Sequence, residues 1–156
     1  MIMKVAQKIS LFVLFSIISG TCASQSSKSL PTYTKQQLLY IGIGPCNNGE
    51  VATEENHKGC STKPIGYTID AADAEPESAF VEVFAGNDTM NNKIVSPDGD
   101  HGGGSTESIG YLSKKPVRGG AKIRAGKEPC NNGIATQSYR HLGCGTRFLG
   151  YALPLR

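Results

Sequence analysis

The chain has 156 residues, with 16 Lys and Arg, 13 Asp and Glu, 5 Cys and no Trp. This length fits one domain of ordinary size and excludes a large multidomain enzyme. Charged residues make up 19% and hydrophobic residues 38% of the chain, which excludes an acidic disordered tail and a collagen-like polymer. A polytopic membrane protein is also excluded, because the sequence contains a single long apolar run.

The N-terminal residues have the order of a secretory signal peptide. Lys4 and Lys8 precede an apolar run over residues 9–18, and small residues up to Ala23 follow it. A run of about ten residues is short for a membrane span, which takes about 20. We therefore predict a signal peptide over residues 1–23, secretion and no stable membrane insertion, with an uncleaved anchor as the alternative. The polar residues 24–35 are predicted to be disordered.

Removal of the signal peptide changes the charge and the cysteine count. Loss of Lys4 and Lys8 leaves 14 basic and 13 acidic residues, which is not the strong basic excess of a nucleic-acid-binding protein. Loss of Cys22 leaves an even number of cysteines, and in a secreted chain this predicts two disulfides. The four remaining cysteines are Cys46, Cys60, Cys130 and Cys144.

Three segments of the chain repeat one another. They begin with CNNGEVATEENHKGCSTKPIGY at Cys46, MNNKIVSPDGDHGGGSTESIGY at Met90 and CNNGIATQSYRHLGCGTRFLGY at Cys130. They align without gaps, and the aligned positions include an Asn pair, a His, a Thr and a Gly-Tyr pair. Self-similarity of this kind is the signature of a repeat architecture. With the strands expected upstream, the repeats cover about residues 36–69, 80–113 and 120–153.

The middle repeat lacks both cysteines and has Met90 and Gly104 at the aligned positions. Their joint absence favours a disulfide within each outer repeat. The pairs would be Cys46 with Cys60 and Cys130 with Cys144. Each bridge would close a loop of about 15 residues, which contributes about 3 kcal/mol through the entropy of the unfolded chain. A pairing between the first and third repeats would leave the same pattern, so that alternative stays open.

Each repeat is predicted to contain a strand, a turn, a short polar connection and a second strand. Apolar residues alternate before the Asn pair, as at Leu39, Ile41 and Ile43, and again around the Gly-Tyr pair. One such unit cannot bury its apolar face alone, so three should share a core. We predict a mainly β, disulfide-stabilised domain over residues 36–156 with a pseudo-threefold, β-trefoil- or β-prism-like arrangement. The alternative is three modules in a row, joined by linkers at 70–78 and 114–120.

The histidines of the chain, His57, His101 and His141, occupy one repeat position. Three imidazoles on a threefold axis would form a zinc site of the three-histidine type, but we favour local packing of each histidine. A zinc site of Cys46, His57 and Cys60 is disfavoured, because secretion favours oxidised cysteines. No metal or other cofactor is predicted.

Catalysis is not expected from this sequence. Asp100, His101 and Ser105 are close in sequence, but a triad is recognised by geometry rather than by sequence proximity. The histidines recur with the repeat, whereas a catalytic residue is normally unique. A small secreted hydrolase or nuclease that uses a histidine is the enzymatic alternative.

Each repeat also carries one tyrosine near its end, Tyr67, Tyr111 or Tyr151. Three such aromatic side chains are a way to build a multivalent sugar site, although a strand-borne tyrosine usually packs in the core. A lectin-like module is therefore an alternative function. Asn87 begins an Asn-Asp-Thr tripeptide and is a candidate for N-glycosylation in a eukaryotic source.

Charge is unevenly distributed along the chain. Residues 24–113 contain five basic and twelve acidic side chains, whereas residues 114–156 contain nine basic and one acidic. One interpretation is that the two parts attract each other within the fold. The other is that the basic part forms a patch for an anionic partner. That patch would consist of Lys114, Lys115, Arg118, Lys122, Arg124 and Arg140.

In its organisation the chain resembles the small, secreted, cysteine-containing effector proteins of plant-pathogenic fungi. The resemblance lies in the signal segment, the few paired cysteines and the lack of an enzyme motif, and it assigns no functional residue. It implies a virulence protein that binds a host component, outside the host cell or after delivery into it. We therefore expect a secreted protein that binds a host protein, with an extracellular glycan as the alternative partner.

Overall fold

The computed structural model describes residues 31–156, which contain eleven β-strands, three short 3-10 turns and no α-helix. The predicted signal peptide, residues 1–23, lies outside the described residues. Residues 32–156 form one compact unit and not three modules in a row. Within the described part of the chain, no helix has the length and apolar character needed to cross a membrane. The prediction of a mainly β fold with disulfides is confirmed.

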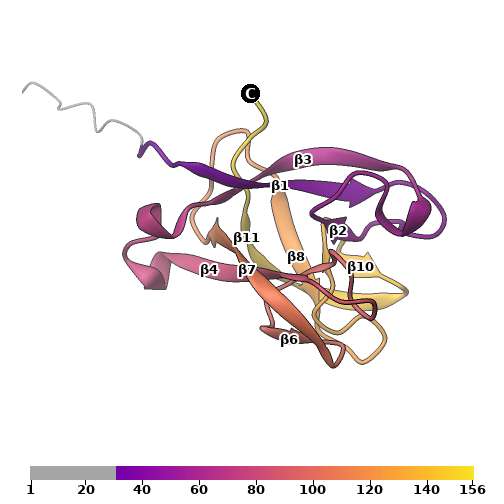
Figure 1. Ribbon diagram of the computed structural model, residues 1–156. Helices are drawn as coiled ribbons and strands as arrows, with labels where there is room; N and C mark the ends of the chain where they lie inside the picture. Colours follow the sequence, from indigo (N-terminus) through magenta and orange to yellow (C-terminus); the bar gives the residue numbers. More distant parts are fainter. Residues whose placement is uncertain (1–30) are drawn as a thin grey trace, which may run out of the picture. The chain divides into compact units, whose positions relative to one another are not determined.

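Three antiparallel pairs of long strands form the framework (Figure 1). They are β1 (Lys35–Gly42) with β3 (Thr62–Ile69), β4 (Phe80–Gly86) with β7 (Gly104–Ser113), and β8 (Lys122–Gly126) with β11 (Cys144–Tyr151). We call the regions around these pairs the first, middle and third segments; they coincide with residues 36–69, 80–113 and 120–153.

Shorter strands and turns occupy the loops within and between the long pairs. β2 (Val51–Ala52) pairs with β1, β5 (Val95–Ser96) with β4, and β9 (Ala135–Thr136) with β8. β6 (Asp100–His101) pairs with β7, and β10 (Arg140–His141) pairs with β11. The 3-10 turns are η1 (His57–Gly59), η2 (Ala71–Asp73) and η3 (Glu77–Ala79).

The second strands of the three pairs join the segments to one another. Ile69 of β3 pairs with Tyr111 of β7, and Ser113 of β7 pairs with Tyr151 of β11. Tyr67 of β3 forms a bridge with Leu153, just beyond β11, and the two residues exchange backbone hydrogen bonds of 2.9 and 2.7 Å. Each segment therefore contacts both of the others through its backbone.

The glycines of the Gly-Tyr pairs permit this close approach. A Cβ atom on Gly66 would lie 2.4 Å from the carbonyl oxygen of Leu153, and one on Gly110 would lie 2.6 Å from that of Ile69. Real Cβ atoms do not approach backbone oxygen this closely, so any larger residue would push the two backbone segments apart. Gly150 approaches the middle segment in the same way.

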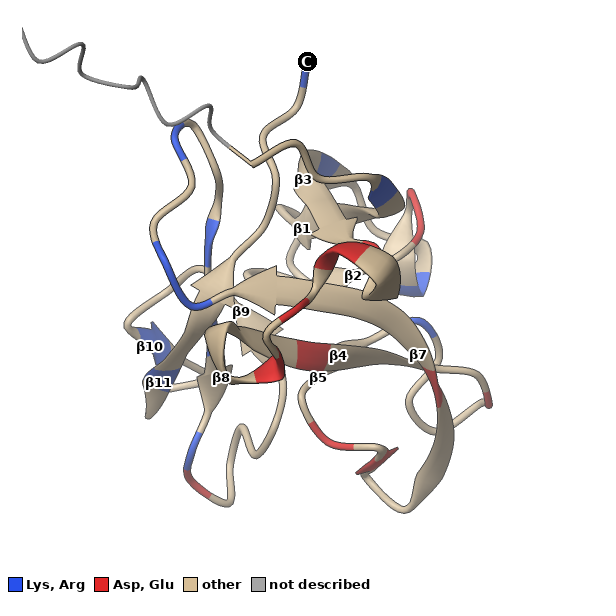
Figure 2. Ribbon diagram, turned by 90° about the vertical axis from the view of Figure 1, so that its left-hand side faces the viewer, with Lys and Arg blue, Asp and Glu red and all other residues tan. Residues whose placement is uncertain are grey.

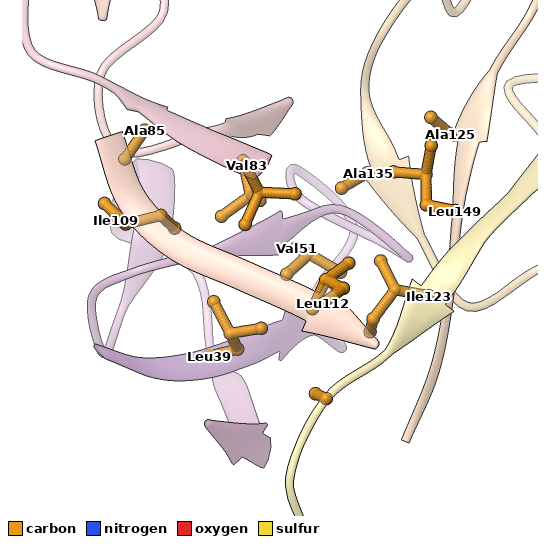
Figure 3. Packing of buried hydrophobic residues seen from close by; sticks show 12 residues of the cluster. Leu39, Val51, Val83, Ala85, Ile109, Leu112, Ile123, Ala125, Ala135 and Leu149 are labelled. Carbon is orange, nitrogen blue, oxygen red and sulfur yellow. The ribbon is translucent and has the colours of Figure 1, made fainter. Parts of the chain in front are cut away.

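The main hydrophobic core lies where the three strand pairs meet (Figure 3). Leu39, Val83 and Ile123, which occupy aligned positions in the first strands, are fully buried there together with Leu112. Burial of an aliphatic side chain of this size contributes about 1.5–3 kcal/mol. A second cluster contains Ile69, Phe80, Ala74 and Leu153.

The N-terminal end of the described chain packs on that second cluster. The ring of Tyr33 lies edge-on to Phe80, with 6.0 Å between the ring centroids. The backbone N–H of Asp70 donates to the carbonyl oxygen of Thr34, and Lys35 is the first residue of β1. Residues 32–35, which end the segment predicted to be disordered, are therefore part of the folded unit.

Candidate functional site

The loop of each segment is held by a buried asparagine. The side-chain amide of Asn47 donates to the carbonyl oxygen of His57 at 2.9 Å. Asn91 and Asn131 make the aligned bonds to the next two histidines, at 2.9 and 3.0 Å. Our sequence analysis missed this role, although the aligned Asn pairs were the signal for it. The first Asn of each pair is thus a structural clip rather than a binding residue.

The two disulfides lie in the outer loops. Cys46 bonds to Cys60 and Cys130 bonds to Cys144, with Cα–Cα distances of 6.1 and 6.4 Å. The pairing is therefore within each outer segment, which is the alternative that the missing cysteines of the middle segment favoured. Because both sulfurs of the first pair are in a disulfide, they are not thiolate ligands for a zinc site with His57.

Two of the three histidines lie at separate contacts between segments. Nδ1 of His141 lies 3.3 Å from where a Cβ atom on Gly49 would be, and Nδ1 of His101 lies 2.9 Å from the corresponding point on Gly133. Each ring therefore faces a turn of a different segment from its own. The described residues contain no group of three or more His, Cys, Asp or Glu that could hold a metal ion. The three imidazoles do not meet on an axis.

His57 differs from the other two because carboxylates surround it. Its Nε2 lies 3.5 Å from Glu50 Oε2 and its Nδ1 lies 3.4 Å from Glu54 Oε1. The ammonium of Lys58 lies 2.8 Å from Glu50 Oε2. Burial disfavours the charged form of Glu50, but hydrogen bonds from His57 and Lys58 outweigh burial and hold the pKa of this carboxyl below its usual value.

The other two histidines have pKa values below the usual value of a histidine. Burial lowers the pKa of His101 against the opposing charge of Asp98, and burial likewise lowers the pKa of His141. The catalytic alternative gains no support at His101. The hydroxyl of Ser105 donates to Asn87 and Asp88 rather than to the His101 ring.

The repeated tyrosines are half-buried. Tyr67 and Tyr111 pack against the second hydrophobic cluster, and the ammonium of Lys35 lies 4.2 Å from the centre of the Tyr67 ring. Tyr151 lies edge-on to Phe148 at 5.2 Å. Burial raises the pKa of Tyr111, and nearby carboxylates add to the shift. These side chains contribute to packing, which is the interpretation that the sequence favoured over sugar binding.

β8 of the third segment carries an exposed and a half-buried cation beside aromatic rings. Lys122 and Arg124 lie on β8, and Arg124 pairs across the strands with Phe148 of β11. The Lys122 ammonium lies 5.3 Å from the centre of the Phe148 ring, and the Arg124 guanidinium lies 4.3 Å from that of Tyr139. Tyr139 is 71% exposed and Phe148 is 39% exposed. We call Lys122, Arg124, Tyr139 and Phe148 the basic face.

Hydrogen bonds fix the position of Arg124 on this face. Its Nε donates to the hydroxyl of Thr146 at 2.8 Å and one terminal nitrogen donates to the Thr146 carbonyl oxygen at 3.0 Å. An arginine held in this way presents its charge without a further loss of side-chain entropy on binding. The sequence predicted the cations of this face but not Tyr139 and Phe148. The sequence of a single strand does not show which of its aromatic side chains remain exposed in the fold.

In the part of the chain that the structure describes, the Lys and Arg side chains of residues 114–156 have no carboxylate within ion-pair distance. The ion pairs of the described residues all lie within residues 50–58. None of the nine Lys and Arg residues in 114–156 takes part in one. Figure 2 shows cations at β8, β10 and β11, on the loop between β7 and β8 and at the C-terminus, whereas acidic residues gather along β4 and the loops near β7. No ion pair therefore supports the interpretation that the two parts attract each other internally.

Arg140 follows Tyr139 of the basic face in sequence and lines a cleft between two loops, which no residue of the basic face lines. The cleft has a volume of about 360 Å³ and is lined by residues from the loops 45–50 and 138–142. Its walls come from the first and third segments, and they include Glu50 and His141 as well as Arg140.

Asn87, the candidate glycosylation site, is exposed at the end of β4. Its side-chain oxygen accepts a hydrogen bond from the hydroxyl of Ser105, so the amide is held against the middle loop.

The comparisons with known proteins assign no relative: no family model, curated protein or solved structure matches the chain.

Proposed function

We propose that the protein is a secreted, effector-like binding protein that engages a host protein and catalyses no reaction. The basic face is the contact surface, and the partner presents an acidic surface to it. One observation carries the proposal: residues 114–156 hold nine cations and one carboxylate, and no cation among them has an ion-pair partner in the described chain.

The chemistry of the basic face suits a protein partner. Aromatic side chains and arginine dominate the energy of protein interfaces, where they fill desolvated pockets. Tyr139 and Phe148 supply apolar area, while Lys122 and Arg124 supply unmatched charge above their rings. Complementary charge also accelerates association and excludes partners of the wrong sign.

The proposal includes a pseudo-threefold arrangement of the three segments, of a β-trefoil or β-prism type. It is supported by the aligned strand pairs, the aligned asparagine clips and the glycine contacts between segments. In this arrangement the three segments share one scaffold, and the charge of the third adapts it for binding. Two disulfides support an oxidising location such as the extracellular space.

A peptide-display selection on the oxidised protein tests the proposed partner chemistry. We expect peptides rich in Asp and Glu on the wild type, with binding that weakens as salt screens the charges. The double variant Lys122→Glu, Arg124→Glu should lose these peptides. Because Arg124 also bonds Thr146, Tyr139→Ala serves as a second variant that removes no internal hydrogen bond.

A matched control separates the basic face from net charge. Lys114→Glu, Lys115→Glu changes the charge of the same part of the chain by the same amount, at residues that follow β7. Binding should persist in this control. If the acidic peptides bind Lys122→Glu, Arg124→Glu as well as the wild type, the basic face is not the contact surface.

A further inference from the structure

The cleft between the first and third segments is a separate feature from the basic face. Neither Lys122 nor Arg124 lines it, and its volume of about 360 Å³ falls within the range of small-molecule sites. One wall comes from residues 45–50 and the other from residues 138–142. These loops are far apart in sequence, and the contacts between segments bring them together.

The charges of the cleft are matched on one side only. Glu50 is 6% exposed, and the Lys58 ammonium lies 2.9 Å from its Oε1 and 2.8 Å from its Oε2. The charge of this carboxylate is therefore compensated within the first segment. Arg140, in the opposite wall, forms no ion pair with the described residues. The guanidinium of Arg140 is the uncompensated charge at the cleft.

A buried histidine without a hydrogen-bond partner lies in the same wall. His141 lines the cleft and is 4% exposed, and its Nε2 has no hydrogen-bond partner in the described part of the chain. A neutral imidazole carries one N–H donor and one acceptor nitrogen. Leaving such a group buried and unpaired is unfavourable, so a ligand that drew the His141 ring toward the cleft could complete its hydrogen bond.

We propose that this cleft is an oxyanion-binding site that takes a phosphate or carboxylate group. Arg140 supplies the planar fork of donors that matches such a group. The Asn48 amide and the Ser138 hydroxyl, which also line the cleft, provide further donors. A neutral ligand would leave the charge of Arg140 unmatched. The site does not depend on the proposed function, because its residues are distinct from the basic face.

NMR titrations of the oxidised protein with inorganic phosphate, glutamate and glucose test the site. We expect saturable shifts of the amide signals of residues 48–50 and 138–142, and of the His141 ring, with at least one of the two anions. Glucose should produce none. Arg140→Gln should weaken anion binding by about tenfold or more, the effect of a hydrogen bond between charged groups. Because Arg140 is exposed, the variant should fold.

Arg147→Gln is the matched control, since Arg147 is an exposed residue of β11 with the same charge and does not line the cleft. It should retain anion binding. Phosphate binding alone assigns a phosphate-bearing ligand, and glutamate binding alone assigns a carboxylate, such as an acidic side chain of a partner. The proposal would be overturned if Arg140→Gln and Arg147→Gln lost anion affinity equally. It would also be overturned if the shifts spread over residues 114–156 or if no saturable shift occurred. Retained phosphate binding in Lys122→Glu, Arg124→Glu would separate this site from the basic face.

Discussion

The outer loops and the middle loop achieve the same closure with different chemistry. Cys46–Cys60 closes the first loop, where Gly44 stands at the position of Asp88 in the middle loop. In the middle loop, Asp88 accepts hydrogen bonds from the N–H groups of Met90 at 2.9 Å and Ser105 at 2.7 Å. These backbone hydrogen bonds hold the pKa of Asp88 below its usual value. A carboxylate thus does in the middle loop what a disulfide does in the first.

The third loop contains both devices. Glu128, aligned with Asp88, accepts a hydrogen bond from the N–H of Gly145 at 2.9 Å, and the disulfide Cys130–Cys144 lies beside it. The asparagine clip is present in all three loops. All three loops therefore share the asparagine clip, whereas the additional support is a disulfide in the first loop, a carboxylate in the middle loop and both in the third.

Removal of either disulfide should have the largest effect on stability, and the resulting loss of local hydrogen-exchange protection should differ between the outer loops. Cys46→Ser, Cys60→Ser and the corresponding pair at 130 and 144 should each lower the free energy of unfolding by about 3 kcal/mol, because the closed loops are equally long. Denaturant unfolding measures this loss. Hydrogen exchange should show that Gly145 keeps protection through Glu128, whereas the first loop loses it. Equal loss of protection in both loops would contradict the comparison.

A disulfide engineered into the middle loop should succeed only after the carboxylate is removed. A Cβ atom on Gly104 would lie 2.6 Å from Asp88 Oδ1, so Met90→Cys, Gly104→Cys should strain the loop in the wild-type background. Addition of Asp88→Gly, which copies Gly44, should allow a bridge worth up to about 3 kcal/mol. Thermal unfolding of the oxidised variants measures the difference. Similar stabilisation with and without Asp88→Gly would refute the idea that the Asp88 carboxylate and a bridge at Gly104 compete for space in the middle loop.

The smallest expected effect is a local pH dependence of the middle loop. The pKa of Asp88 is lowered in the folded state, so its support is present above the unfolded value of about 3.9 and is lost as pH falls through the folded value. Hydrogen exchange at the Ser105 amide should therefore accelerate at acidic pH, beyond the intrinsic rate. Asp88→Asn should remove this dependence, and the first loop, with Gly44, should not show it.

Local patterns in the sequence predicted the strands and the disulfide pairing. Alternating apolar residues mark strands because successive side chains point to opposite faces, and Leu39, Val83 and Ile123 are indeed buried. The missing pair Met90 and Gly104 favoured bridges within the segments. These features depend on neighbours in sequence, which an alignment of the repeats displays.

Contacts between segments could not be predicted in this way. The histidines share one repeat position, yet His57 lies among carboxylates, whereas His101 and His141 face glycine turns of other segments. The cleft could not be found either, because Glu50 and Arg140 come to line one cleft only through the packing of two segments. Which residue faces which depends on three-dimensional packing that no spacing encodes.

The backbone crossings at Gly66, Gly110 and Gly150 determine how the protein can be divided. Each segment forms backbone hydrogen bonds with both of the others. Removal of any one segment would therefore leave backbone groups of the other two without hydrogen-bond partners. A fragment of one or two segments should therefore not fold independently. A proteolytic cut in a connection such as residues 70–79 should instead leave two pieces held together, and the nicked chain would keep its surfaces in place.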